Sequence, residues 1–311
     1  MVKYVLKRIL ISVVTLLVII IILFCLLKLM PGSPFNNERM TDAQRATLEA
    51  KFGLDKPIIQ QVAIYVKNML TGDFGVSYSI QANYPVSRLI ANKFPLTIKI
   101  GLQAAVIGIL AGILLGMVAA LSHNGFWDTV TTIVSMIGAS IPAQVLALGL
   151  VYFFAFKLGW FPLTYSSKVP IHSTILATLS LALSPMSIAA RFTRNELLEV
   201  LGSEYITLAE SKGMPRKRVL IVHALKNTLV PLITAMAPMT IMLLMGSTVI
   251  ERIFSIPGIG SLFINAITSN DYNVVLTLAF IFSSMYIGVM LLVDILYGII
   301  DPRIRLSGGA K

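Results

Sequence analysis

The sequence predicts an all-α integral membrane protein with six transmembrane helices, and three observations support this prediction. Hydrophobic residues make up 56% of the 311 residues and charged residues only 13%, whereas soluble domains carry about 25% charged residues. Six apolar stretches are long enough to cross a hydrocarbon core of roughly 30 Å as helices. Basic residues gather in a few of the connections between these stretches, as expected of a multi-pass membrane protein.

The predicted spans, in chain order, are residues 9–27, 96–121, 129–156, 174–190, 229–250 and 274–296. The first follows Lys3, Lys7 and Arg8, as the apolar part of a signal peptide would. It is about twice as long as an ordinary h-region, and no small-residue cleavage site follows it. We therefore interpret it as a retained span.

The distribution of basic residues predicts that both termini are cytoplasmic. With the N-terminus inside, thirteen basic residues face the cytoplasm, in segments 1–8, 191–226 and 303–311. The short loops opposite hold only Lys157, Lys168 and Arg252. The connection between the first two spans is so long that its basic residues have little influence on orientation. The net charge of +11 then reflects topology and attraction to anionic lipid. Nucleic-acid binding is not predicted, because the basic residues are not interleaved with aromatic ones.

The external connection after the first span is predicted to be helical. Thr41-Asp42-Ala43-Gln44 matches a capping box, which predicts a helix that ends at Gly53. Asp55-Lys56-Pro57 opens a second helix that ends near Gly72. Its apolar face would carry Ile58, Val62, Tyr65 and Met69.

Two periodic patterns inside the spans each allow two interpretations. Glycines recur every fourth residue in the second span, at Gly108, Gly112 and Gly116. They permit the close approach of another helix, from this chain or from another subunit. Methionines recur every third residue in the fifth span, at Met236, Met239, Met242 and Met245. Flexible thioether chains suit either a path for varied side chains or ordinary packing.

Catalytic and metal-binding patterns are missing from the sequence. No Gly-rich phosphate loop ends in Lys-Ser or Lys-Thr, so we do not expect this chain to bind ATP, and no serine lies in a nucleophile elbow. His123, His172 and His223 fall in different loops on both predicted sides, so no metal site is expected. Cys25 is the only cysteine, which excludes a disulfide within the chain.

Among the ionisable residues of the predicted spans we single out only Asp294, near the cytoplasmic end of the sixth span. Intramembrane charges often mark a proton or ion relay. Asp294 could instead pair with Arg191 or Arg303. A transporter driven by its own ion coupling would normally carry more such residues, so we expect any energy for uphill transport to come from a partner.

The segment from Gly202 to Pro231 predicts a basic helical elbow between two spans. Ser203 is placed to cap a helix, with Glu204 in the first turn. Gly213 ends that helix, and Pro215 suits the first turn of the next one. The second helix continues into the fifth span, so the elbow could transmit force. The alternative is a connector that is helical because of its caps and basic only for topology.

Six short motifs occur in an order typical of one family. They are Leu29-Met30-Pro31-Gly32, Phe52-Gly53-Leu54-Asp55-Lys56-Pro57, Gly72-Asp73-Phe74-Gly75, Tyr205 to Gly213 with His223-Ala224-Leu225-Lys226-Asn227, Glu251-Arg252-Ile253-Phe254 with Pro257-Gly258-Ile259-Gly260, and Asp301-Pro302-Arg303. Over essentially its whole length the chain resembles the B-type permease subunits of oligopeptide, dipeptide and nickel ABC importers. Ser33 stands where that family usually has Asp.

The resemblance implies a type I ABC importer permease fold in a bacterial plasma membrane. It implies an N-terminal helix (1–30), an external helical segment (31–95), a five-helix transmembrane domain (96–298) containing a coupling segment (202–227), and a cytoplasmic tail (299–311). The implied partners are a second homologous permease subunit, two ATPase subunits that bind ATP and Mg²⁺, and an extracytoplasmic substrate-binding protein, with a peptide as substrate. A secondary transporter or channel that acts without ATPases is the alternative.

The same resemblance implies two sets of site residues and no catalytic residue, bound cofactor or metal. The ATPase-coupling residues would be Glu204, Tyr205, Ala209, Gly213, Met214 and Pro215. The substrate path would include Gln144, Met239, Met242 and Ser247. Ala209 and Gly213 would permit close contact with a partner groove. Thr207 and Leu208 stand where the generic importer motif has Glu and its first Ala.

Overall fold

The computed structural model describes residues 2–29, 47, 49–50, 53 and 55–300. The chain divides into two compact units, Met1–Pro95 with Pro257–Lys311, and Leu96–Ile256. Helices make up the regular structure of the described residues, beside one isolated bridge between Val76 and Pro85. The all-α prediction is therefore confirmed at the level of fold class, whereas the division into functional segments stays a prediction.

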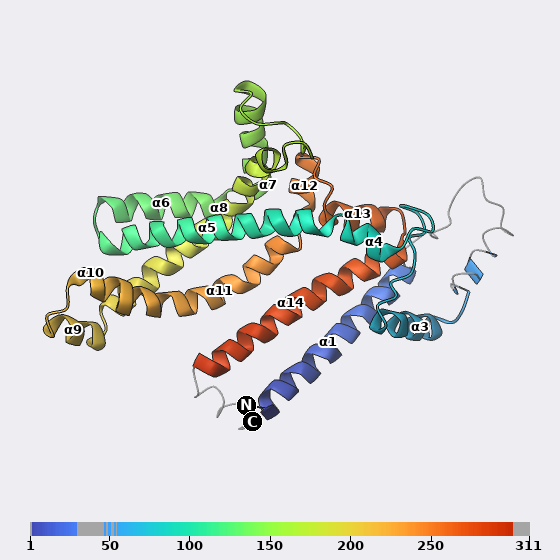
Figure 1. Ribbon diagram of the computed structural model, residues 1–311, viewed down its shortest axis with the longest axis horizontal. Helices are drawn as coiled ribbons and strands as arrows, with labels where there is room; N and C mark the ends of the chain where they lie inside the picture. Colours follow the sequence, from blue (N-terminus) through green and yellow to red (C-terminus); the bar gives the residue numbers. More distant parts are fainter. Residues whose placement is uncertain (1, 30–46, 48, 51–52, 54, 301–311) are drawn as a thin grey trace. The chain divides into compact units, whose positions relative to one another are not determined.

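Unit 1 is built on the first and last long helices of the chain. Helix α1 (Val2–Leu29) and helix α14 (Tyr272–Ile300) run side by side, α1 in blue and α14 in red in Figure 1. The described residues of this unit also form three shorter helices: α3 (Ile58–Leu70), α4 (Val86–Ala91) and α13 (Ile259–Thr268). Its core contains Phe24, Val86, Leu89, Ile259, Val274 and Leu278, all buried.

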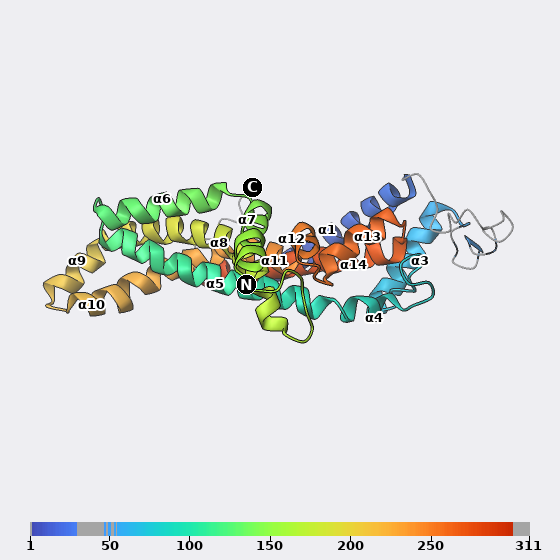
Figure 2. The same ribbon diagram turned by 90° about the horizontal axis from the view of Figure 1, so that it is seen from above.

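Unit 2 packs several helices around one long helix, α8 (Pro170–Leu201). The others are α5 (Phe94–Leu121), α6 (Phe126–Ser140), α7 (Ala143–Leu150), π-helix η1 (Val151–Lys157), α9 (Glu204–Ser211), α10 (Arg216–Arg218), π-helix η2 (Val219–Leu225), α11 (Lys226–Leu244) and α12 (Thr248–Ile253). Helices α6, α7 and α11 each pack on α8. Figure 2 shows α5, α6 and α8 running alongside one another.

The glycines of α5 face the backbone of α8. A Cβ atom at Gly108, Gly112 or Gly116 would lie 2.6, 2.4 or 2.5 Å from a carbonyl oxygen of α8, those of Ala182, Met186 and Ala190 respectively. No side chain fits at such distances, so glycine lets the two helices approach closely, which is how helices associate where lipid supplies no hydrophobic drive. Of the two interpretations of this pattern, the structure supports packing within the chain.

Within the part of the chain that the structure describes, four helices are long and apolar enough to cross a membrane: Leu6–Leu27, Val86–Leu121, Pro170–Leu201 and Tyr272–Val293. Two bent helix pairs, Phe126–Ser140 with Ala143–Lys157 and Arg216–Leu229 with Pro231–Leu244, raise the number to as many as six if each pair is one span. The chain is therefore a multi-pass membrane protein. The number six stays a prediction.

The predicted third span, 129–156, is not one continuous helix. It breaks between α6 and α7 with a bend of 98°. Ile141 is extended (φ −81°, ψ 119°) and Pro142 follows it. Proline has no N–H to continue the helix and disfavours helical geometry in the residue before it. The apolar run was read correctly, but the break that Pro142 imposes was missed.

The predicted fifth span, 229–250, is also not one continuous helix. Helix α11 ends at Leu244, Gly246 adopts a positive φ of 85°, and a new helix starts at Thr248. A second bend of 46° occurs beside Pro231, where the helix lacks one backbone hydrogen bond. Met236 is buried beside Leu232, while 66% of the Met242 side chain is exposed. The methionines therefore do not form a single surface.

The external segment of unit 1 agrees in part with its prediction. Helix α3 starts after Pro57, as predicted, with Val62, Tyr65 and Met69 turned toward the core of unit 1. Ile58 is exposed, which corrects its place on that face. Several predictions lie outside the described residues: the capping box 41–44, motif residues 30–33, Phe52, Leu54, the side chain of Asp294 and residues 301–311.

Candidate coupling site

Helix α9 begins after Ser203, but the hydroxyl of Ser203 does not cap it. The Ser203 Oγ donates instead to the carbonyl oxygen of Val200, at 2.6 Å, and so closes the end of α8. The predicted side-chain cap is therefore wrong. Glu204 does lie in the first turn, as predicted, where the positive end of the helix dipole favours an anion.

The C-terminal end of α9 is a Schellman motif. The Met214 N–H donates to the Ala209 carbonyl oxygen at 3.4 Å, and the Gly213 N–H donates to that of Glu210 at 2.9 Å. Gly213 has φ +78°, a conformation in which a residue with a Cβ atom is strained. Pro215 follows, and the next helical turn starts at Arg216. The predicted elbow, ended by Gly213 and restarted after Pro215, is confirmed.

One side of α9 is buried in unit 2. Ile206 and Ala209 belong to a cluster with Ala120 of α5, Leu197 of α8 and Val219 of η2. Figures 1 and 2 both place α9 and α10 at the end of this unit where α5 turns into α6. This packed cluster therefore connects α9 directly to α5 and α8.

The opposite side of α9 is exposed. Glu204, Leu208 and Ser211 follow one another at helical spacing and are all exposed, with 56% of Leu208 accessible. Residues four apart lie on one face of a helix. Tyr205 lies at the edge of this face, and its hydroxyl oxygen accepts a hydrogen bond from Asn227 Nδ2 at 2.9 Å. We call the exposed stripe Glu204, Leu208 and Ser211 the outer face of α9.

The six predicted coupling residues therefore have different positions. Glu204 and Tyr205 are exposed, and Gly213 and Pro215 shape the backbone of the elbow. Ala209 is only 5% exposed and Met214 packs on the same cluster. This corrects the expectation that the Ala209 side chain contacts a partner groove, since it packs inside its own chain.

Leu208 was passed over as a departure from a motif, although it is the large apolar side chain of the outer face. Its spacing of four from Glu204 places both residues on one face of the helix, but the sequence does not show that this face is the exposed one.

The four predicted path residues lie on three helices or their starts. Gln144 is exposed on α7, Met239 and Met242 lie on α11, and Ser247 immediately precedes α12. Helices α7 and α12 pack against each other, which brings the helix of Gln144 to that of Ser247. Their role as a path stays a prediction.

A buried carboxylate that the sequence reasoning did not single out lies beside Ser247. Glu251 is buried and accepts a hydrogen bond from Thr97 Oγ1 at 2.9 Å. Gly246 leaves room for it, because a Cβ there would lie 2.8 Å from Glu251 Oε1. Glu251 stood in a family motif, but its partner is 154 positions away in the sequence.

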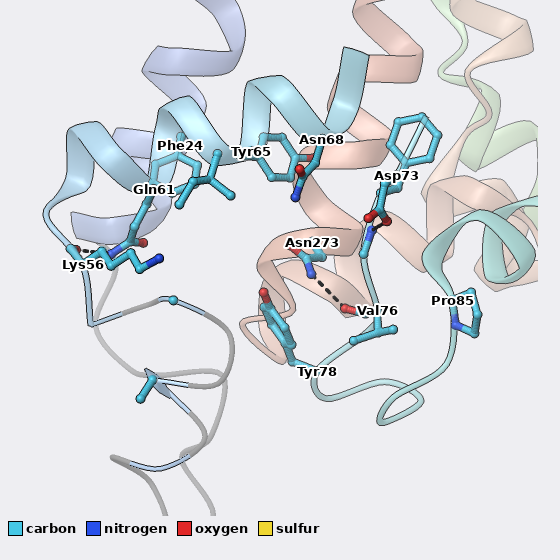
Figure 3. Close-up of a pocket in the computed structure, with 15 residues that line it drawn as sticks. Phe24, Lys56, Gln61, Tyr65, Asn68, Asp73, Val76, Tyr78, Pro85 and Asn273 are labelled. Atoms are coloured by element: carbon cyan, nitrogen blue, oxygen red, sulfur yellow. Dashed lines mark hydrogen bonds between the residues drawn. The ribbon is translucent and has the colours of Figure 1, made fainter. Parts of the chain in front are cut away.

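Unit 1 contains a separate pocket of about 630 Å³ between α3, α14 and the loop after α3. Figure 3 shows Tyr65 and Asn68 from α3, Tyr78 from the loop and Asn273 from α14 around it. Asn273 Nδ2 donates to the Val76 carbonyl oxygen at 2.9 Å. Burial raises the pKa of the Tyr65 and Tyr78 hydroxyls well above the usual range, so both stay neutral hydrogen-bond donors at physiological pH.

The described residues contain no group of three or more His, Cys, Asp or Glu side chains arranged to hold a metal ion. Cys25 is a free cysteine on α1.

Comparison with known protein families shows to which family the chain belongs. The family described as "Binding-protein-dependent transport system inner membrane component" matches residues 112–306, and the corresponding N-terminal family matches residues 1–101. The chain belongs to this family of inner-membrane transport components.

Individual relatives show more closely which kind of transport component the chain is. The chain is 41% identical over 308 residues to the dipeptide transport system permease protein DppB of Bacillus subtilis (strain 168), covering 98% of this chain and 99% of the relative. It is 40% identical to DppB of Lactococcus lactis subsp. cremoris (strain MG1363) and 38% to the oligopeptide transport system permease protein OppB of Escherichia coli (strain K12), covering 98% of this chain and all of each relative. It is an ABC importer permease subunit related to these B-type proteins.

Solved structures agree in fold. A crystal structure of an amino acid ABC transporter with histidines has a TM-score of 0.53 at 17% identity, covering 67% of this chain and 92% of that chain. An inward-facing structure of the MetNI methionine ABC transporter has a TM-score of 0.53 at 16% identity, covering 68% and 97%. The shared fold is that of an ABC importer permease.

Proposed function

We propose that this chain forms half of the translocation path of an ATP-driven peptide importer and couples the movement of two ATPase subunits to alternating access. The coupling role is supported by the way in which α9 packs on unit 2. Its inner side is buried in the core of unit 2, and its outer face is exposed with Leu208 accessible. A helix held on one side and open on the other is suited to receive a partner and to pass on its movement.

The choice of peptide as substrate is based on the relatives. Their names specify dipeptide and oligopeptide transport, and the similarity extends over 98% of this chain. The remaining components are a second homologous permease subunit, an extracytoplasmic binding protein and two ATPase subunits that bind ATP and Mg²⁺. The complex is placed in a bacterial plasma membrane with both termini of this chain inside, as the basic residues favour.

In this proposal the ATPase groove accepts the outer face of α9. Leu208 supplies apolar area, and full burial of such a side chain contributes about 1.5–3 kcal/mol. Glu204 and the exposed part of Tyr205 form a polar rim, an arrangement common at interfaces. When nucleotide binding moves the ATPases, α9 is displaced, and its core contacts with Ala120 and Leu197 carry the displacement into α5 and α8.

The test is a substitution on the outer face. Leu208→Asp should leave the fold intact because the side chain is exposed, yet it should weaken co-purification of the ATPase subunits and abolish ATP-dependent peptide uptake. Ile59→Asp on α3 is the matched control, since Ile59 is 83% exposed and lies on the segment assigned to the opposite side. Full ATPase recovery and uptake in Leu208→Asp would reject α9 as the coupling site.

A further inference from the structure

Two side chains of unit 2 form a two-point ion pair between helices. Arg194 of α8 donates through Nε to Oδ1 of Asp128 at 2.6 Å, and through Nη2 to Oδ2 at 2.8 Å. Asp128 lies in the first turn of α6 and is only 4% exposed. A planar guanidinium paired with both carboxylate oxygens fixes orientation as well as distance.

The same carboxylate also organises the turn between α5 and α6. Its Oδ2 accepts a hydrogen bond from the Asn124 backbone N–H at 2.9 Å, and Asn124 has φ +59°. His123 Nδ1 lies 3.5 Å from Asp128 Oδ2 and 3.5 Å from Arg194 Nη2. Asp128 therefore connects the turn to Arg194, and through Arg194 to α8.

Arg194 lies at one of the close contacts between α8 and α5. A Cβ at Gly116 of α5 would meet the Arg194 backbone nitrogen at 3.0 Å. One turn further along α8, Leu197 is buried in the cluster that seats Ile206 and Ala209 of α9. The ion pair is thus next to the place where α9 joins the unit.

We propose that Asp128 and Arg194 are positioning residues for coupling, which lock the α5–α6 turn to α8 so that a displacement of α9 moves α5, α6 and α8 together. The inference rests on the proposed function of α9. The two-point pair opposes sliding and rotation of α6 against α8, in addition to the packing between these helices.

The experiment uses the whole complex in proteoliposomes, with ATPase subunits, binding protein and a labelled dipeptide. Peptide transported per ATP hydrolysed is compared for wild type, Asp128→Ala, Arg194→Ala, the double variant and Arg194→Lys at equal amounts of assembled complex. We expect each alanine variant to keep hydrolysing ATP while transport per ATP falls about tenfold. The double variant should fall no further than Asp128→Ala, because that variant already removes the ion pair together with the hydrogen bond from Asn124. Arg194→Lys keeps the positive charge but cannot form the two-point pair. It should therefore show a value of transport per ATP between those of wild type and Arg194→Ala.

Ser135→Ala is the matched control. Ser135 is also buried on α6, but its hydroxyl donates to the carbonyl oxygen of Thr131 in the same helix, so transport per ATP should not change. If uptake and hydrolysis fall in parallel, or if the two single effects multiply in the double variant, the positioning role is overturned. A wild-type complex without ATP-dependent uptake would overturn the proposed function itself, and with it this inference.

Discussion

The backbone N–H of Met214 donates to the carbonyl oxygen of Ala209, and the side chain of Ala209 is buried beneath that same turn. One hydrogen bond thus connects the turn that ends α9 to the residue that packs α9 into unit 2. Gly213 lies between Ala209 and Met214 with a positive φ. The position of the outer face of α9 therefore depends on this short stretch of backbone.

Gly213→Ala should weaken coupling without removing the chain from the membrane. A Cβ at this position has no heavy atom within 4 Å, so the cost is that of the backbone conformation alone, roughly 1–2 kcal/mol. Peptide uptake at equal amounts of membrane-inserted subunit should fall severalfold. Gly213→Asn is the control, since Asn tolerates this conformation better, and it should retain most uptake. Equal losses in both variants would contradict the explanation.

Asp271→Ala should destabilise unit 1. The Oδ2 atom of this buried carboxylate accepts from the Ser77 hydroxyl and from the backbone N–H groups of Tyr78, Ser79 and Ile80. Removing the acceptor takes a hydrogen bond from the buried Ser77 hydroxyl and from three part-buried or exposed N–H groups, and the loss at a buried group costs about 1–3 kcal/mol.

The apparent Tm of the purified subunit in detergent measures the effect. The control is Asp73→Ala, whose carboxylate is exposed and accepts only a local bond from the Gly75 N–H. The Tm should fall by several degrees for Asp271→Ala and stay nearly constant for Asp73→Ala. Similar shifts in the two variants would show that the buried carboxylate does not hold this loop.

Gly112→Leu should separate α5 from α8. A Cβ at Gly112 would lie 2.4 Å from the Met186 carbonyl oxygen, and overpacking of this kind costs about 1–3 kcal/mol or more. Gly149→Ala on α7 meets nothing within 4 Å and should be neutral or stabilising, because alanine favours helix over glycine. Yield and apparent Tm should fall for the first variant only. An unchanged Tm for Gly112→Leu would refute the close approach of the two helices.

Ser211→Cys reports which side of the membrane α9 faces. In a Cys25→Ser background, an impermeant thiol reagent should label this residue in inside-out vesicles and not in intact cells, since the distribution of basic residues predicts a cytoplasmic elbow. Ile59→Cys on α3 should give the opposite pattern. Labelling of residue 211 from outside would reverse the topology.

Local patterns in the sequence predicted much of this architecture. Apolar run length indicated the membrane helices, Gly213 and Pro215 indicated the elbow, and the four-residue spacing of Gly108, Gly112 and Gly116 indicated a close helix contact. Each of these features depends on residues that are close together in the sequence. It can therefore be recognised without knowing which segment it contacts in the fold. The break at Pro142 was signalled in the same local way but was missed.

Interactions between distant residues could not be predicted. The partners Asp128 and Arg194 are 66 positions apart, and Ser77 and Asp271 are 194 apart, so nothing in the local sequence identifies them as pairs. The burial of Ala209 was likewise hidden, because a short helix of mixed character does not reveal which side is covered. Which residues pair and which side of α9 is buried depend on packing in three dimensions.

Nucleotide dependence of uptake tests the central claim most directly. The purified chain, alone, with the second permease subunit, and in the full complex with ATPases and binding protein, is reconstituted in proteoliposomes with a labelled dipeptide. Accumulation against a gradient should occur only in the full complex with Mg²⁺ and ATP. Vectorial accumulation by the chain without ATPase subunits or nucleotide would contradict the claim and favour a secondary transporter.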